Sequence, residues 1–153
     1  MEQTTPQQVK KFKTFTYQTS VEWKSHRQGF LQSEGKPQID VSSPPEFKGI
    51  AGVWTPEDLF VAAVEICQMS TFLSFGSRKG LPLRSYKSSA VGTLENVDGK
   101  YRFTIVVVKP TIIVENSWTK EQVDELVRTA HDNCLIGNSV STKVIVEPNI
   151  IIE

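Results

Sequence analysis

One segment limits the possible folds more than any other, a long helical pattern in the middle of the chain over residues 55–79. Thr55 suits the position before the first turn and Pro56 the first helical position, where a missing N–H has no cost. Gly80 ends the pattern. Apolar residues nearly encircle the helix from Leu59 to Leu73. Such a helix must be covered on all sides, so we predict a buried central helix.

The residues before this helix predict short strands. Phe15, Tyr17 and Trp23 fall on one side of an alternating pattern with polar residues between them, which predicts a half-buried strand from residue 15 to about residue 24. Two shorter strands are expected around residues 30–33 and 39–41, followed by an irregular loop. Residues 1–14 are expected to be a frayed tail.

The residues after the helix predict a hairpin, a second helix and a last strand. Asp98-Gly99 joins two expected strands, over residues 86–95 and 100–108. Thr119 and Gln122 suit a capping box that opens a helix reaching about Cys134. A final strand is expected over residues 144–146. The order of the elements predicts one α+β domain over residues 15–153.

Composition excludes several classes of function. The 153 residues carry 17 basic and 17 acidic side chains, which argues against a broad nucleic-acid-binding face. The polar and then basic start lacks the apolar core of a signal peptide, and no long apolar run predicts a membrane span. We therefore expect a cytoplasmic protein without nucleic-acid or membrane partners, in a compartment where cysteines are kept reduced.

The two cysteines are the main candidates for chemistry. Cys67 lies in the central helix and Cys134 at the end of the second one, and neither has a CxxC partner. Buried thiols are often inert, but Glu65, Gln68 and Ser70 are unusually polar company for a core cysteine. A reactive thiolate needs a nearby cation, and Arg27 is the best candidate; the alternative is an ordinary surface arginine.

A metal site is the less favoured interpretation of the same residues. His131 and Cys134 are spaced for one face of a helix and could form half of a site. Completing it would need His26 and Cys67, the remaining histidine and cysteine. We therefore expect neither a metal nor a bound cofactor.

Three segments stand in this order along the chain: VEWKSHRQGFLQSEG, SPPEFKGIAGVWTPEDLFVAAVEICQMSTFL and AHDNCLIGNSV. In the same order they are similar to segments of the OsmC/Ohr family of organic hydroperoxide reductases. VEWKSHRQGFLQSEG resembles the family's opening hairpin, with an arginine in its turn. SPPEFKGIAGVWTPEDLFVAAVEICQMSTFL resembles its loop and central helix, and AHDNCLIGNSV resembles its second cysteine segment, with Asn138 a few positions on. The resemblance implies an intertwined homodimer, with antiparallel sheets wrapped around two central helices.

The resemblance also implies roles for four residues. Cys67 corresponds to the peroxidatic cysteine and Cys134 to the resolving one. Arg27 corresponds to the arginine that stabilises the thiolate, and Glu57 to the glutamate that holds this arginine. Glu57 and Cys67 are separated by about 15 Å along a straight helix and by about 80° around it, so a shared site needs a long bridging arginine or a second subunit.

Three residues depart from the family pattern. Glu65 stands two positions before Cys67, where small or apolar residues are usual, and would raise the thiol pKa if it pointed at the sulfur. Leu135 takes the place after Cys134 where many relatives have proline. Trp54, before the helix, resembles a less characterised branch.

The function implied by the resemblance is reduction of organic hydroperoxides to alcohols through a two-cysteine cycle. An external dithiol, typically of lipoyl type, would restore the thiols. The alternative is a non-catalytic dimer of the same fold that binds a small apolar ligand, with both cysteines structural.

Overall fold

The computed structural model describes residues 12–153, which form two compact units that meet in the sequence between Trp54 and Thr55. The expected single domain stays a prediction, since each unit is described by itself. Most of the expected frayed tail, residues 1–11, lies outside the described residues. Residues 12–19 have no regular secondary structure.

The first unit is a small antiparallel sheet in the order β1-β2-β3. Its strands are β1 (Ser20–Ser25), β2 (Gln28–Gln32) and β3 (Ile39–Ser42), followed by the short helix η1 (Pro45–Phe47). The expected half-buried strand from residue 15 is wrong in both extent and burial. Regular structure begins only at Ser20, and Phe15, Tyr17 and Trp23 are 72%, 93% and 74% exposed. The alternating apolar residues are present in the sequence, but residues 12–153 do not bury their side chains.

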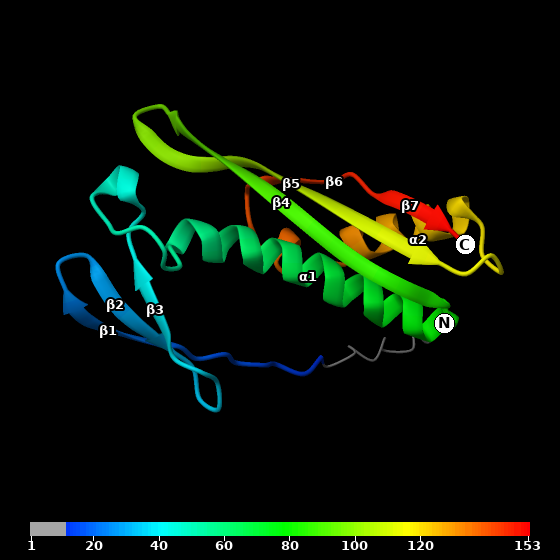
Figure 1. Ribbon diagram of the computed structural model, residues 1–153, viewed down its shortest axis with the longest axis horizontal. Helices are drawn as coiled ribbons and strands as arrows, with labels where there is room; N and C mark the ends of the chain where they lie inside the picture. Colours follow the sequence, from blue (N-terminus) through cyan, green and yellow to red (C-terminus); the bar gives the residue numbers. More distant parts are fainter. Residues whose placement is uncertain (1–11) are drawn as a thin grey trace, which may run out of the picture. The chain divides into compact units, whose positions relative to one another are not determined.

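The second unit holds the long helix α1 (Pro56–Lys79), which begins and ends as the sequence predicts (Figure 1). The Thr55 hydroxyl accepts the Asp58 N–H, while the Asp58 carboxylate accepts the Thr55 N–H, so the free amides of the first turn are satisfied. At the other end, Gly80 takes the left-handed conformation with φ 70° that glycine adopts without strain.

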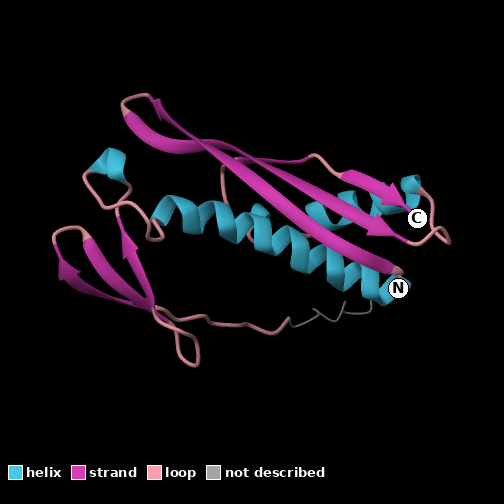
Figure 2. Cartoon of the chain, in the orientation of Figure 1, coloured by secondary structure: helices cyan, strands magenta, loops and turns pink. Residues whose placement is uncertain are grey.

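A long hairpin of β4 (Leu83–Val97) and β5 (Lys100–Val114) runs beside α1 (Figure 2). Asp98 and Gly99, at its tip, both have positive φ, as predicted for a tight hairpin turn. Gly92 of β4 is needed for close packing, since a Cβ there would lie 2.5 Å from the Val61 side chain of α1.

Beyond the hairpin, the second helix and two short strands complete the unit. They are α2 (Lys120–Asp132), with the expected Thr119–Gln122 capping box, then η2 (Gly137–Ser139), β6 (Lys143–Val146) and β7 (Asn149–Ile152). Both strands pair in parallel with β5, at 105–108 and then at 111–114. The fold class is confirmed as α+β, but this sheet is mixed rather than wholly antiparallel.

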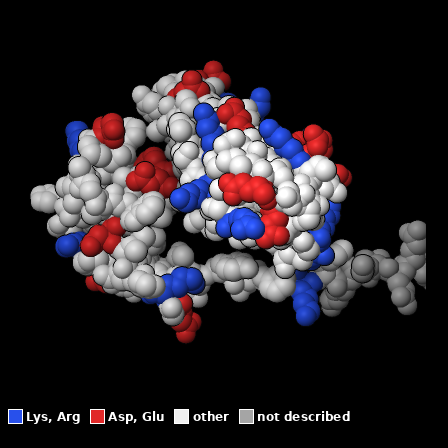
Figure 3. Space-filling view, turned by 45° about the vertical axis from the view of Figure 1, so that its right-hand side comes forward, with Lys and Arg blue, Asp and Glu red and all other residues white. Residues whose placement is uncertain are grey.

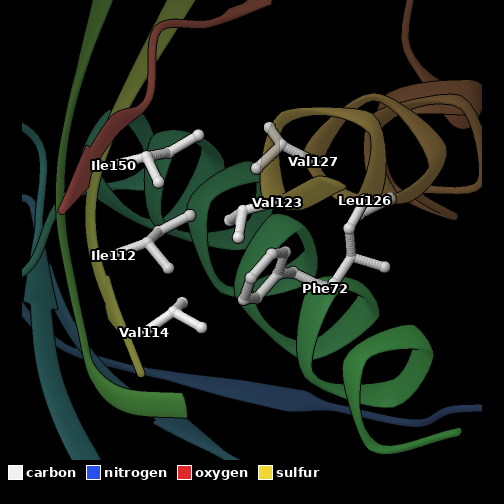
Figure 4. Packing of buried hydrophobic residues seen from close by; sticks show 8 residues of the cluster. Phe72, Ile112, Val114, Val123, Leu126, Val127 and Ile150 are labelled. Atoms are coloured by element: carbon white, nitrogen blue, oxygen red, sulfur yellow. The ribbon is translucent and has the colours of Figure 1, made fainter. Parts of the chain in front are cut away.

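The core of the second unit lies between α1, α2 and the sheet (Figure 4). Phe72 of α1 and Leu126 of α2 meet Ile112 of β5 in one cluster of buried apolar side chains. A smaller cluster joins Val64 of α1 to Val106 and Val108 of β5. This packing fixes the helix that carries Cys67 against the helix that leads to Cys134.

The helix α1 is less buried than its sequence predicts. Ile66 and Leu73 are 58% and 38% exposed, so one side of this apolar helix is uncovered within the chain. An 18-residue window of α1 has a mean hydropathy of 1.5, so by length and composition alone it could cross a membrane, contrary to the expectation above. Core helices pass the same test, and α1 packs against α2 and β4.

Charged side chains of both signs are interspersed on the surface seen in Figure 3. This agrees with the balanced composition of 17 basic and 17 acidic residues. The expectation that nucleic acid is not a partner rests on that balance and stays a prediction.

Candidate active site

The two cysteine side chains lie against each other in the second unit. Cys67 is carried by the middle of α1 and is 9% exposed, whereas Cys134 follows α2 and is fully buried. Both are free thiols, and the Cys134 thiol donates a hydrogen bond to the Cys67 sulfur. The two side chains therefore interact, which a two-cysteine cycle requires.

The segment that follows Cys134 folds over both sulfurs. We call residues 134–139 the Cys134 turn. The Ile136 N–H donates to Cys67 Sγ at 3.5 Å, and the Gly137 N–H donates to Cys134 Sγ at 3.3 Å. The Thr71 hydroxyl, one helical turn after Cys67, lies 3.9 Å from the Cys67 sulfur.

These contacts give the two thiols opposite acidities. Burial on its own raises the pKa of the Cys67 thiol, but hydrogen bonds outweigh it and leave this pKa below its ordinary value. The donors are, in order of effect, the Ile136 N–H, the Cys134 thiol, the Thr71 hydroxyl and the Leu135 N–H.

The partner thiol is held in its protonated form. Burial, and then the hydrogen bond that it donates to Cys67, raise the pKa of Cys134 to about 11. At neutral pH the proton therefore stays on Cys134, and Cys67 is the sulfur that ionises first.

Glu65 points away from the sulfur, so the condition for its unfavourable effect is not met. Its carboxylate accepts a hydrogen bond of 2.5 Å from the Ser88 hydroxyl of β4. Its charge contributes, after burial, to raising the pKa of Tyr86 to about 12. The Glu65 side chain is thus a polar contact between α1 and the hairpin.

Arg27 and Glu57 lie in different compact units. Arg27 occupies the turn between β1 and β2, with an exposed side chain and a carbonyl that accepts the Ser43 N–H. Glu57 lies in the first turn of α1, where its negative charge suits the helix dipole. Neither side chain forms an ion pair with residues 12–153.

One oxygen of Glu57 has no visible partner. Its Oε2 is buried and accepts no hydrogen bond from residues 12–153. Buried carboxylate oxygens are normally paired, so this atom is the natural place for a donor supplied from elsewhere.

The histidine beside Cys134 is engaged by a core glutamine. His131 Nδ1 lies 3.1 Å from Nε2 of Gln68, the buried neighbour of Cys67. Over residues 12–153, no group of three or more His, Cys, Asp and Glu side chains is arranged to hold a metal.

Thr71 and the Ile136 N–H, two of the donors to Cys67, were missed from the sequence. Thr71 could have been found, because it lies four positions after Cys67 on the same helix face. The Ile136 N–H could not, because a backbone donor has no residue type and its direction depends on the conformation of the turn.

The fold and the buried pair of cysteines define a class of protein, and a family model named "OsmC-like protein" matches residues 49–149. The chain belongs to this OsmC-like family. No curated protein sequence matches the chain.

Solved structures of other proteins share this fold. An OsmC-like protein of unknown function from Vibrio cholerae has a TM-score of 0.82 and 29% identity, over 88% of this chain and 99% of that one. An organic hydroperoxide resistance protein from Legionella pneumophila has a TM-score of 0.71 and 20% identity, over 90% and 97% of the two chains. One from Elizabethkingia anophelis has a TM-score of 0.73 and 19% identity, over 92% and 99%. At these lower identities the likeness concerns the fold.

Proposed function

We propose that the protein is a thiol peroxidase that reduces organic hydroperoxides to alcohols, with Cys67 as the peroxidatic and Cys134 as the resolving cysteine. The observation that carries the proposal is the contact between the two sulfurs, with one thiol acidified and the other held protonated. Such a difference between the pKa values of two neighbouring thiols is typical of a reactive pair rather than of two inert core cysteines. Two structural neighbours named for hydroperoxide resistance support the same reaction class.

The chemistry follows in three steps. The Cys67 thiolate attacks the distal oxygen of the hydroperoxide, the O–O bond breaks, and the alkoxide leaves as the alcohol after gaining a proton. Cys67 is now a sulfenic acid. The Cys134 sulfur attacks the Cys67 sulfur, its proton leaves with the hydroxyl as water, and a disulfide forms. An external dithiol reduces this disulfide by exchange and is itself oxidised.

We assign supporting roles to Arg27 and Glu57. Arginine presents several donors in a planar fork, which suits both a thiolate and the oxygens of a peroxide. The buried, unpartnered Oε2 of Glu57 is a suitable acceptor for such a guanidinium. The arginine of the same chain or that of a second subunit can fill this role.

The direct test is turnover of cumene hydroperoxide with dihydrolipoamide as reductant, with hydrogen peroxide compared under the same conditions. We expect catalytic turnover, with the organic substrate preferred, because the reactive cysteine lies on a helix rich in apolar residues. Absence of turnover with any dithiol, together with tight binding of small apolar ligands, would favour the non-catalytic alternative.

We also propose that two copies of the chain form a homodimer through the uncovered side of α1. Ile66 and Leu73 are exposed on a helix whose other side is in the core. Symmetric dimers commonly bury such a face. Light scattering should give about twice the chain mass of 17.2 kDa. Leu73→Lys should shift the protein toward monomer, whereas Ser117→Lys, in an exposed loop, should not; a monomeric wild type would refute the dimer.

A further inference from the structure

The first three carbonyl groups of the Cys134 turn accept hydrogen bonds from within the turn itself. The Cys134 carbonyl accepts the Asn138 N–H at 2.9 Å, and the Ile136 carbonyl accepts the Ser139 N–H at 3.0 Å. The Leu135 carbonyl accepts the Ser139 hydroxyl at 2.6 Å. The turn is therefore closed by its own later residues.

The N–H groups of Ile136 and Gly137 point the other way, toward the sulfurs. In a trans peptide unit the C=O and N–H point in opposite directions, and the described chain has no cis peptide bonds. The unit that joins Leu135 to Ile136 is thus held at its oxygen by Ser139 and donates its hydrogen to Cys67 at 3.5 Å. Ser139 and the reactive sulfur are thus hydrogen-bonded to opposite sides of the same rigid peptide unit.

We propose that Ser139 is a positioning residue for the Cys67 thiolate: its hydroxyl fixes the peptide plane whose N–H stabilises the ionised sulfur. This rests on the proposed role of Cys67 as nucleophile. A hydrogen bond to an ionised acceptor is roughly twice as strong as one to a neutral acceptor, so a donor held on the sulfur favours the thiolate over the thiol.

The position of Ser139 makes it testable apart from folding. Its side chain is exposed, so its replacement should have little effect on the free energy of unfolding. Without it, the Leu135 carbonyl can turn toward water, and the Ile136 N–H turns with it. The Cys134 thiol and Thr71 still donate to Cys67, so the loss should be partial.

The experiment measures the pKa of the Cys67 thiol from its alkylation rate against pH, with the labelled site identified by mass spectrometry. Ser139→Ala should raise this pKa by about half a unit, a loss of about threefold in thiolate well below the pKa. Ser139→Thr keeps the hydroxyl and should restore the wild-type value. Ser141→Ala removes an exposed serine without side-chain hydrogen bonds to residues 12–153 and should change nothing.

A second variant tests the N–H itself. Cys134 can serve as the ligation point for a synthetic segment of residues 134–153 in which an ester replaces the amide between Leu135 and Ile136. The ester removes the donor, keeps the side chains, and should raise the Cys67 pKa by about one unit, or tenfold in thiolate. If Ser139→Ala does not fold, the ester variant still tests whether the Ile136 N–H stabilises the Cys67 thiolate.

The outcomes separate this inference from the proposed function. An unchanged thiol pKa in Ser139→Ala would overturn the role of Ser139 and leave hydroperoxide turnover untouched. A pKa of about 8.5 for the wild-type Cys67 thiol, the ordinary value for cysteine, would also overturn the role of Ser139. A Ser139-dependent pKa in a protein without peroxidase turnover would support the positioning role and refute the proposed function alone.

Discussion

Replacing Cys67 by serine is expected to reduce hydroperoxide turnover by about a thousandfold or more. A serine hydroxyl in the same place is not ionised at neutral pH, and it cannot form a sulfenic acid or a disulfide. A thousandfold loss corresponds to about 4 kcal/mol of transition-state stabilisation. Turnover is followed as the loss of dithiol at a fixed concentration of cumene hydroperoxide.

Cys134→Ser should behave differently from Cys67→Ser. Cys67 can still reduce one hydroperoxide molecule, so a single turnover should remain, and the sulfenic acid should accumulate on Cys67 where a dimedone label can trap it. Ser74→Ala, at an exposed position of α1, is the control and should retain full activity. Full activity in Cys67→Ser would assign the chemistry to another residue. Undiminished multiple turnover in Cys134→Ser would remove the two-cysteine cycle.

The second large effect is expected at Arg27. If its guanidinium stabilises the Cys67 thiolate, Arg27→Ala should raise the thiol pKa by one or more units, each worth about 1.4 kcal/mol. The acidic limb of the plot of peroxidase rate against pH should then move to higher pH by the same amount. The reason for the sign is that a lost cation disfavours the ionised sulfur, so a higher pH is needed to form it.

Two conservative variants refine the Arg27 prediction. Arg27→Lys should recover only part of the rate, because an ammonium cannot form the two-pronged contact of a guanidinium. Glu57→Gln should cost less than Arg27→Ala, because it loosens the arginine without removing its charge. Lys24→Ala, at an exposed cation of β1 that is paired with Asp40 of β3 at 3.8 Å, is the control.

Melting temperatures distinguish catalysis from folding in this series. Arg27 is exposed, and a surface replacement typically changes stability by about 0.5 kcal/mol or less. We therefore expect nearly unchanged melting temperatures. If Arg27→Ala leaves both the thiol pKa and the rate unchanged, its assigned role is wrong, and the non-catalytic function gains support.

The features that could be predicted from the sequence are those with local causes. Thr55 and Thr119 each form a capping box with the residue three positions later. Asp98-Gly99 forms a tight turn because both residues tolerate a positive φ. The position of Cys67 on α1 follows from the same local rules. These elements depend on neighbours in the sequence, so the sequence indicates them directly.

The features that could not be predicted depend on distant contacts. Phe15 and Trp23 alternate as in a half-buried strand, but burial depends on whether another surface covers them, and the described chain leaves them exposed. The strand β7 was missed because four residues after Pro148 give little pattern until β5 is known to pair with them. The contact between Cys67 and Ile136 likewise arises from packing between α1 and the end of α2.

The two short strands along β5 have a consequence for how the protein is made. β5 meets β4 through a two-residue turn, so this hairpin can form as soon as residue 114 is available. The other edge of β5 has its partners only at 143–146 and 149–152. During synthesis, an apolar strand with unpaired N–H and C=O groups is therefore open to wrong pairing until residues 143–152 leave the ribosome. Residues 143–146 and 149–152 thus complete the sheet and also remove the open strand edge at which aggregation could begin.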